Sequence, residues 1–185
     1  MILGCDRIAP LATRLAVVAE PAAGARLWRE HCPAAGTGLV SDGRLATLDI
    51  AAKPTAFSWS LIGNSDLSLS IQPSGHGPGK RLLVDGNADV PRPVLAQQVV
   101  LAAGSYVLSW RSGEAQGEPS DHILAALSCA GEPPAWAAAA LDRSSGLWRA
   151  AVAASPACKV QQLTFAAAPH SGQVWLEEVG LVRAR

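Results

Sequence analysis

The sequence lacks an excess of charge of either sign. Its 185 residues include 15 lysines and arginines against 15 aspartates and glutamates, and only 16% of the residues are charged. A chain without net charge has no overall field that would attract nucleic acid or an anionic membrane surface. We therefore expect no nucleic-acid partner.

Long hydrophobic runs are absent as well, although 49% of the residues are hydrophobic. Alanine supplies much of that fraction, and no apolar run reaches the roughly 20 residues that a membrane-spanning helix needs. We therefore expect no membrane span. The length suits one main domain with a short appendage, but not two full domains.

Motifs for catalysis and for metal binding are missing too. There is no G-x-S-x-G nucleophile elbow, no H-E-x-x-H helix and no C-x-x-C pair. The four histidines, which are His31, His76, His122 and His170, are scattered along the chain without the spacing of metal ligands. We therefore expect a protein that is not an enzyme and that needs no cofactor for catalysis.

What is present divides the chain into a helical segment, residues 1–38, and a β domain, residues 39–185. Apolar residues at Leu11, Leu15 and Leu27 follow helical spacing, and Pro21 and Gly24 are expected to break the segment into two pieces. Trp28 is the expected anchor of this segment on the rest of the protein.

From residue 39 onward, the pattern changes to short strands separated by glycine, proline, serine and asparagine. The expected strands are 39–49, 57–62, 67–72, 81–85, 94–101, 106–111, 123–129, 148–154, 158–166 and 173–182. About ten strands is the number expected for two packed antiparallel sheets. The clearest pattern is VLAQQVVLAAGSYVLSW at 94–110, which predicts a β-hairpin with Gly104 in the turn and with Tyr106, Leu108 and Trp110 on one face.

Seven parts of the β domain follow one another in an informative order. They are LVSDGRL (39–45), FSW (57–59), LLV (82–84), Gln97, Leu101, GSY (104–106) and VWLEEVGL (174–181). In this order they resemble the jelly-roll carbohydrate-binding modules and galactose-binding-like domains, over about residues 39–183. The resemblance lies in the strand pattern, so it is more specific for fold than for ligand. It implies an all-β, antiparallel jelly-roll β-sandwich that follows a short N-terminal helical segment.

The resemblance also implies a function. Such a module is noncatalytic and recognises a glycan or an envelope component. The pattern is also similar to the C-terminal module of uncharacterised proteobacterial proteins that have helical repeats upstream. The alternative is therefore a structural or protein-interaction module of a larger helical-repeat protein, with a protein partner in place of the glycan.

Related modules often hold a structural calcium near paired aspartates of the closing strand. Here Glu177 and Glu178 replace the aspartates, and Gly43, Arg44 and Leu45 replace an acidic opening. A calcium ion needs about six to eight oxygen ligands, and adjacent residues of a strand point to opposite faces. We therefore expect at most one of the two glutamates to join a structural calcium site, if the chain holds one.

Tryptophan is the expected sugar contact, because its face packs against the apolar C–H face of a pyranose. Trp59, Trp110 and Trp175 belong to strand patterns and are expected in the core. Trp136 and Trp148 lie beside loops and are the predicted ligand-binding tryptophans, with a core position as the alternative for both.

Arg111, Gln97 and His122 complete the predicted ligand-binding set. They lie on or beside presumed outward strand faces, and we expect them to converge on one sheet surface together with Asp121. Ordinary solvated strand faces also look like this. For Gln97 the alternative is that it satisfies a backbone group inside the sandwich.

Cys129 and Cys158 lie in two late strands and are the candidate disulfide, while Cys5 and Cys32 flank the helical segment. An even number of cysteines allows several pairings and selects none. A Cys129–Cys158 bridge would add about 2–4 kcal/mol of stability in an oxidising compartment, and in the cytosol the same residues would be buried thiols. The compartment cannot be read from the residues, although an extracytoplasmic or envelope-associated location is favoured.

Overall fold

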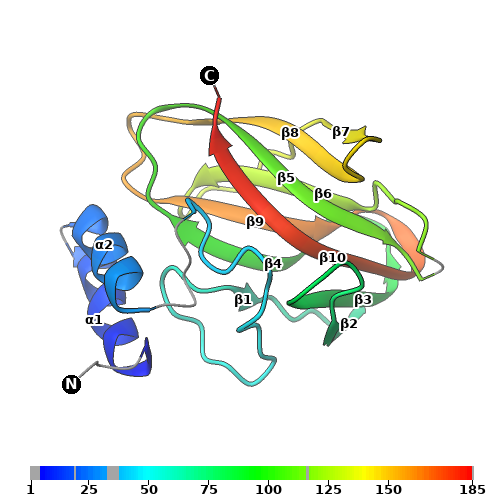
Figure 1. Ribbon diagram of the computed structural model, residues 1–185, viewed down its shortest axis with the longest axis horizontal. Coiled ribbons are helices and arrows are strands. Elements are labelled where there is room, and N and C mark those ends of the chain that lie inside the picture. The colour runs from blue at the N-terminus through cyan, green and yellow to red at the C-terminus, as the bar shows by residue number, and fades with distance from the viewer. Residues whose placement is uncertain (1–4, 19, 33–37, 116, 185) are drawn as a thin grey trace.

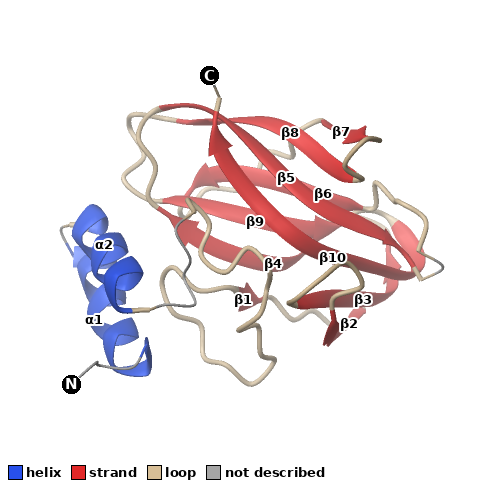
Figure 2. Ribbon diagram, viewed as in Figure 1, coloured by secondary structure: helices blue, strands red, loops and turns tan. Residues whose placement is uncertain are grey.

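The computed structural model describes residues 5–18, 20–32, 38–115 and 117–184. It consists mostly of strands in two antiparallel sheets, with two short helices at one end (Figures 1 and 2). The helices are α1 (Cys5–Val18) and α2 (Pro21–His31). The prediction of an all-β fold with a short N-terminal helical segment is confirmed.

The two sheets have six and four strands. In spatial order, the larger sheet contains β2 (Leu67–Pro73), β3 (Lys80–Ala88), β10 (His170–Arg183), β5 (Gly104–Glu114), β8 (Leu147–Ala154) and β7 (Ala139–Asp142). The smaller contains β1 (Ser60–Leu61), β4 (Arg92–Val99), β9 (Gln161–Ala167) and β6 (Ile123–Cys129). The chain changes sheet from β3 to β4, from β4 to β5 and from β5 to β6, as in a jelly roll.

These crossings make the predicted hairpin wrong. β4 pairs with β1 and β9, whereas β5 pairs with β8 and β10. Gly104 does adopt a positive φ of 148°, but the turn that it belongs to connects the two sheets. Here β4 and β5 follow each other in the chain but belong to opposite sheets, so alternation alone could not reveal that these two strands are not partners.

The main core lies between the sheets. Tyr106, Leu108 and Trp110 alternate along β5 into this core and are at most 3% exposed, as predicted. Phe165 of β9 faces them from the smaller sheet. Its ring centroid lies 5.8 Å from that of Trp110 and 6.1 Å from that of Trp59. Aromatic side chains from both sheets therefore meet in the centre of the sandwich.

The predicted first strand, 39–49, is also wrong, because this segment forms turns. Asp42 adopts a φ of 50°, and its carboxylate accepts hydrogen bonds from the backbone N–H groups of Ala46 and Thr47 at 2.8 and 2.7 Å. Ser-Asp-Gly is turn-forming chemistry, and here it overrides the apolar alternation. β7, by contrast, was missed: its four residues are too few to show a period.

The helices pack on each other and on the loop before β1 through a separate small core. Its members include Ala12, Ala25, Trp28 and Phe57, so Trp28 is the anchor that was predicted. Gly24 does not break α2. A Cβ atom at this position would lie 2.7 Å from the Ala12 carbonyl oxygen, so glycine permits the close approach of the two helices.

The boundary between the helical segment, 1–38, and the β domain, 39–185, stays a prediction, and the joint at 33–37 lies outside the described residues. Within the part of the chain that the structure describes, neither helix combines the length and the apolar character that crossing a bilayer requires.

Candidate functional site

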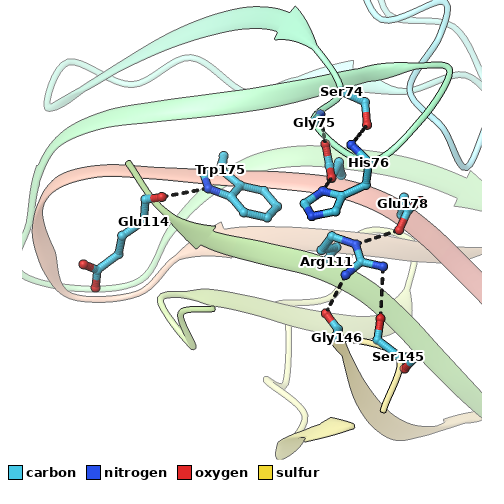
Figure 3. Close-up of polar contacts among 10 residues, drawn as sticks. Ser74, Gly75, His76, Arg111, Glu114, Ser145, Gly146, Trp175 and Glu178 are labelled. Carbon is cyan, nitrogen blue, oxygen red and sulfur yellow. Dashed lines mark hydrogen bonds and ion pairs between the residues drawn. The ribbon is translucent and has the colours of Figure 1, made fainter. Parts of the chain in front are cut away.

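The closing strand β10 carries a β-bulge that changes the direction of its glutamates. The register with β5 shifts between Glu177 and Gly180, and Glu178 adopts a φ of 54°. Glu177 lies opposite Arg111 in the ladder, and the Arg111 Nε donates to Glu178 Oε2 at 2.7 Å (Figure 3). Both carboxylates therefore lie on the outer face of the six-stranded sheet, and the expectation that they point to opposite faces is wrong.

The loop between β2 and β3 covers the first of these carboxylates. Glu177 is only 1% exposed, accepts a hydrogen bond from the Gly75 N–H at 3.2 Å and pairs with Nδ1 of His76. The His76 ring lies 5.8 Å from that of Trp175, whose Nε1 donates to the Glu114 carbonyl oxygen at 2.8 Å (Figure 3). Trp175 is 4% exposed, so its burial was predicted correctly and its face is not open to a sugar.

The guanidinium group of Arg111 donates its hydrogen bonds to other groups of the protein. Besides its bond to Glu178, Nη1 donates to the Gly146 carbonyl oxygen at 3.3 Å and Nη2 to that of Ser145 at 3.0 Å (Figure 3). The guanidinium group thus ties β5 and β10 to the turn between β7 and β8. A ligand-binding role for Arg111 stays a prediction, and its side chain is already hydrogen-bonded to three groups of the fold, on Glu178, Gly146 and Ser145.

The same contacts test whether this region suits calcium. The carboxylate of Glu177 faces an N–H group and a histidine, and the carboxylate of Glu178 faces Arg111. The guanidinium group already holds the carbonyl oxygens that a metal would need, and a calcium ion would be repelled by it. Among the described residues, no cluster of three or more histidine, cysteine, aspartate or glutamate side chains has a metal-binding arrangement. The residues at Glu177–Glu178 therefore do not fit a calcium ion.

Gln97 lies in the other sheet, so the predicted convergence of Arg111 and Gln97 on one surface is wrong. Gln97 is 2% exposed on β4. Its side-chain amide accepts a hydrogen bond from Ser41 N at 2.9 Å and donates one to Ser41 O at 2.8 Å. The structure therefore agrees with the alternative interpretation, in which Gln97 satisfies a backbone segment inside the fold.

A hollow of about 210 Å³ opens at the edge of the sandwich, between β6 and the β7–β8 pair. We call it the edge cleft. It is lined by Trp110, Asp121, Ile123, Leu124, Trp148 and residues 137–139. Trp110 and Trp148 are direct partners in the β5–β8 ladder, so both rings lie on the inner face of the larger sheet.

The edge cleft combines an aromatic wall with one carboxylate. Trp148 is half-buried, and Asp121, an exposed hydrogen-bond acceptor, stands at the rim. The indole Nε1 atoms of Trp110 and Trp148 have no hydrogen-bond partner among the described residues, and both atoms are buried. These two donors are therefore shielded from the cleft.

The other predicted binding residues lie near this cleft without lining it. Trp136 is half-buried and directly precedes Ala137, whose N–H donates to the Ala125 carbonyl oxygen at 2.9 Å. His122 follows Asp121, and its ring stacks on that of His170 with centroids 5.7 Å apart. The spacing of the histidines in the sequence gave no sign of this pair. Binding roles for Trp136, Trp148 and His122 stay predictions.

Trp110 lies in the core, as the sequence predicts, but it also lines the cleft, which the sequence did not predict. The only signal was indirect: Trp110 and Trp148 belong to separate predicted strands, and their meeting depends on the β5–β8 register. Residues 137–139 carried no signal, because an alanine run gives no chemical hint of a wall.

No protein-family model and no curated protein matches the chain. Among solved structures it is similar to a CBM4 carbohydrate-binding module, with 13% identity and a TM-score of 0.48 over 78% of this chain and 99% of that one. It is also similar to the module CBM6cm-2 of Cellvibrio mixtus lichenase 5A, solved with cellotriose, with 16% identity and a TM-score of 0.42 over 68% and 92%. A third is the enzymatically active domain of a bacteriophage CBA120 tailspike, with 11% identity and a TM-score of 0.47 over 80% of this chain and 21% of that one. At such low identities and TM-scores, a ligand for this chain has to be argued from its own residues.

Proposed function

We propose that the chain is a noncatalytic carbohydrate-binding module that takes one sugar ring of a glycan into the edge cleft. The proposal rests on one observation above all: the half-buried indole ring of Trp148 and the exposed carboxylate of Asp121 line the same small hollow. An aromatic face beside a carboxylate suits a ligand that has both an apolar face and hydroxyl groups.

A sugar ring carries groups that are complementary to those of the cleft. An ionised carboxylate only accepts hydrogen bonds, whereas a hydroxyl group can donate one. A hydroxyl group of the ring would therefore donate to the carboxylate of Asp121. The apolar face of the ring would pack against the indole of Trp148.

The volume of the cleft supports a single ring. Its volume of about 210 Å³ greatly exceeds the roughly 30 Å³ that one water molecule occupies in the liquid. It falls below the roughly 300–1,000 Å³ of pockets for drug-sized ligands. We therefore expect the cleft to take one residue of a glycan, with the rest of the chain outside it.

The acidic groups at the cleft support binding without hydrolysis. Glycoside hydrolysis usually needs two carboxyl groups on either side of the scissile bond. Of the described residues that line the cleft, only Asp121 is acidic. A single carboxylate at the rim suits hydrogen bonding to a hydroxyl group.

A glycan array on the purified chain, with and without added calcium, is the first test. We expect a hit whose affinity does not change with calcium. Trp148→Phe reduces the aromatic face at the cleft, so it should weaken binding by about two- to tenfold, and Asp121→Asn should also weaken it.

Trp136→Phe is the matched control, because Trp136 lies close by but does not line the cleft, and it should leave the affinity unchanged. Absence of any glycan hit under either condition would overturn the proposal. So would a hit that is lost in the Trp136 variant and kept in the Trp148 and Asp121 variants.

A further inference from the structure

A second and larger hollow lies where the helices meet the loop before β1. It measures about 650 Å³, and we call it the helix–loop pocket. Its apolar walls include Ala9, Pro10 and Trp28 from the helices and Leu48 and Trp59 from the loop side. This volume lies within the range of small-molecule sites, which occur preferentially where two structural units meet.

The two sides of the pocket are held in place by contacts outside it. The small core around Trp28 includes Ala56 and Phe57 of the loop. The hydroxyl group of Thr13 in α1 accepts a hydrogen bond from the Ala56 N–H at 3.1 Å. On the loop side, Trp59 donates from Nε1 to the Asp42 carbonyl oxygen at 2.9 Å. The pocket therefore does not depend on a ligand for its shape.

Most polar groups around the helix–loop pocket already have partners. Asp49 accepts a hydrogen bond from the Ala51 N–H at 2.9 Å. The hydroxyl groups of Thr55 and Ser58 are bonded to each other at 2.5 Å. The two hydroxyl groups leave little for a ligand to satisfy, and Asp49 keeps a negative charge at the exposed edge, so an anionic ligand group would have to lie on the side of Lys53.

One cationic group at the pocket has no partner among the described residues. Lys53 is exposed at the rim, where its ammonium group forms no ion pair in the described part of the chain. This cation is complementary to an anionic oxygen, and the apolar walls beside it are complementary to hydrocarbon. The Nε1 of Trp28 also has no acceptor among the described residues, but this atom is buried, so the ring contributes an apolar wall to the pocket.

We propose that the helix–loop pocket binds a small apolar carboxylic acid. The hydrocarbon part would lie against Trp28, Leu48 and Trp59, and the carboxylate would lie toward Lys53. This site is separate from the edge cleft and does not depend on the proposed glycan-binding function.

Calorimetric titration with decanoate, below the concentration at which it forms micelles, tests the proposal. Decanol, which has the same chain but no charge, is the matched ligand. We expect saturable binding of one decanoate per chain and weaker binding of decanol. Lys53→Gln should weaken decanoate about three- to fivefold, as suits an exposed charge, and should leave decanol unchanged.

Lys159→Gln is the control variant, because Lys159 is also exposed but does not line the pocket. The indole N–H resonance of Trp28, assigned with Trp28→Phe, should shift as decanoate binds. Because Lys53 is at the surface, its variant tests the proposal even if Trp28→Phe does not fold. Absence of saturable binding, equal affinities for decanoate and decanol, or an unchanged affinity in Lys53→Gln would overturn it.

Discussion

Arg111→Ala should destabilise the fold by about 2 kcal/mol. The side chain of Arg111 is 20% exposed and that of Glu178 is 34% exposed, so their ion pair lies between a surface pair, worth about 0–1 kcal/mol, and a buried one. The variant also removes the two hydrogen bonds to the carbonyl oxygens of Ser145 and Gly146, each worth about 0.5–1.5 kcal/mol. For a chain of this length, about 2 kcal/mol corresponds to a fall in Tm of roughly 4–8 °C.

Thermal unfolding followed by tryptophan fluorescence measures this effect. Arg143→Ala is the control, because Arg143 belongs to the same turn but is exposed, and it should leave Tm within about 1 °C of the parent protein. Arg111→Lys should recover only part of the loss, since a lysine cannot reproduce the forked contacts of a guanidinium group. A Tm of Arg111→Ala equal to that of Arg143→Ala would refute the stabilising role of Arg111.

Calcium makes the same experiment more informative. If the protein had a calcium site, free calcium at a hundred times the Kd of that site would add about 2.7 kcal/mol to the free energy of unfolding of the parent protein. Because the guanidinium group of Arg111 holds the oxygens of Glu178, Ser145 and Gly146, we expect the Tm of the parent protein to be the same in calcium and in EDTA. A higher Tm in calcium than in EDTA would show that a calcium ion binds to the folded protein, and it would contradict our interpretation that Arg111 takes the place of a metal ion here.

Two further predictions concern the disulfide and the turn after β7. Cys129 and Cys158, predicted as a pair, are bonded across 29 residues, so reduction should lower the free energy of unfolding by about 3–4 kcal/mol. The urea midpoint should fall in reductant, and a midpoint that does not move would contradict this; the double variant to serine should not respond. In the turn, hydrogen bonds from the Ser144 and Ser145 side chains lower the pKa of Asp142 from 3.8 to about 2. The folded-state pKa lies below the unfolded one, so this stabilisation is present above about pH 4 and is lost as the pH falls through about 2. Ser144→Ala should raise the carboxyl pKa in an NMR titration, and an unchanged titration would rule out this cause.

The sequence predicted those strands in which apolar and polar residues alternate. Leu67–Pro73 and β5 were found because their apolar residues repeat at every second position. Pairing was less accessible, since the β4–β5 turn looks like that of a hairpin while the strands belong to different sheets. Alternation reports which face of a strand is buried and says nothing of the strand's neighbour.

The candidate sites were less predictable from the sequence, because each depends on strand register or on contacts between residues that are far apart in the chain. The β-bulge at Glu178 places the carboxylate of this residue on the same face of the sheet as that of Glu177, and no pattern in the sequence predicted the bulge. The edge cleft requires Trp110 and Trp148 to be ladder partners. The buried role of Gln97 depends on Ser41, which lies 56 residues away in the sequence.

A row of buried rings joins the two hollows. Trp59 lines the helix–loop pocket, Trp110 lines the edge cleft, and Phe165 lies between them with centroid distances of 6.1 and 5.8 Å. A ligand in one hollow could alter the other through this row only if Phe165 had a second packing arrangement to adopt. Phe165 is 0% exposed, and a close-packed interior leaves little room for another arrangement. The row is therefore a rigid partition, and we expect a ligand bound in one hollow to leave the affinity of the other hollow for its own ligand unchanged.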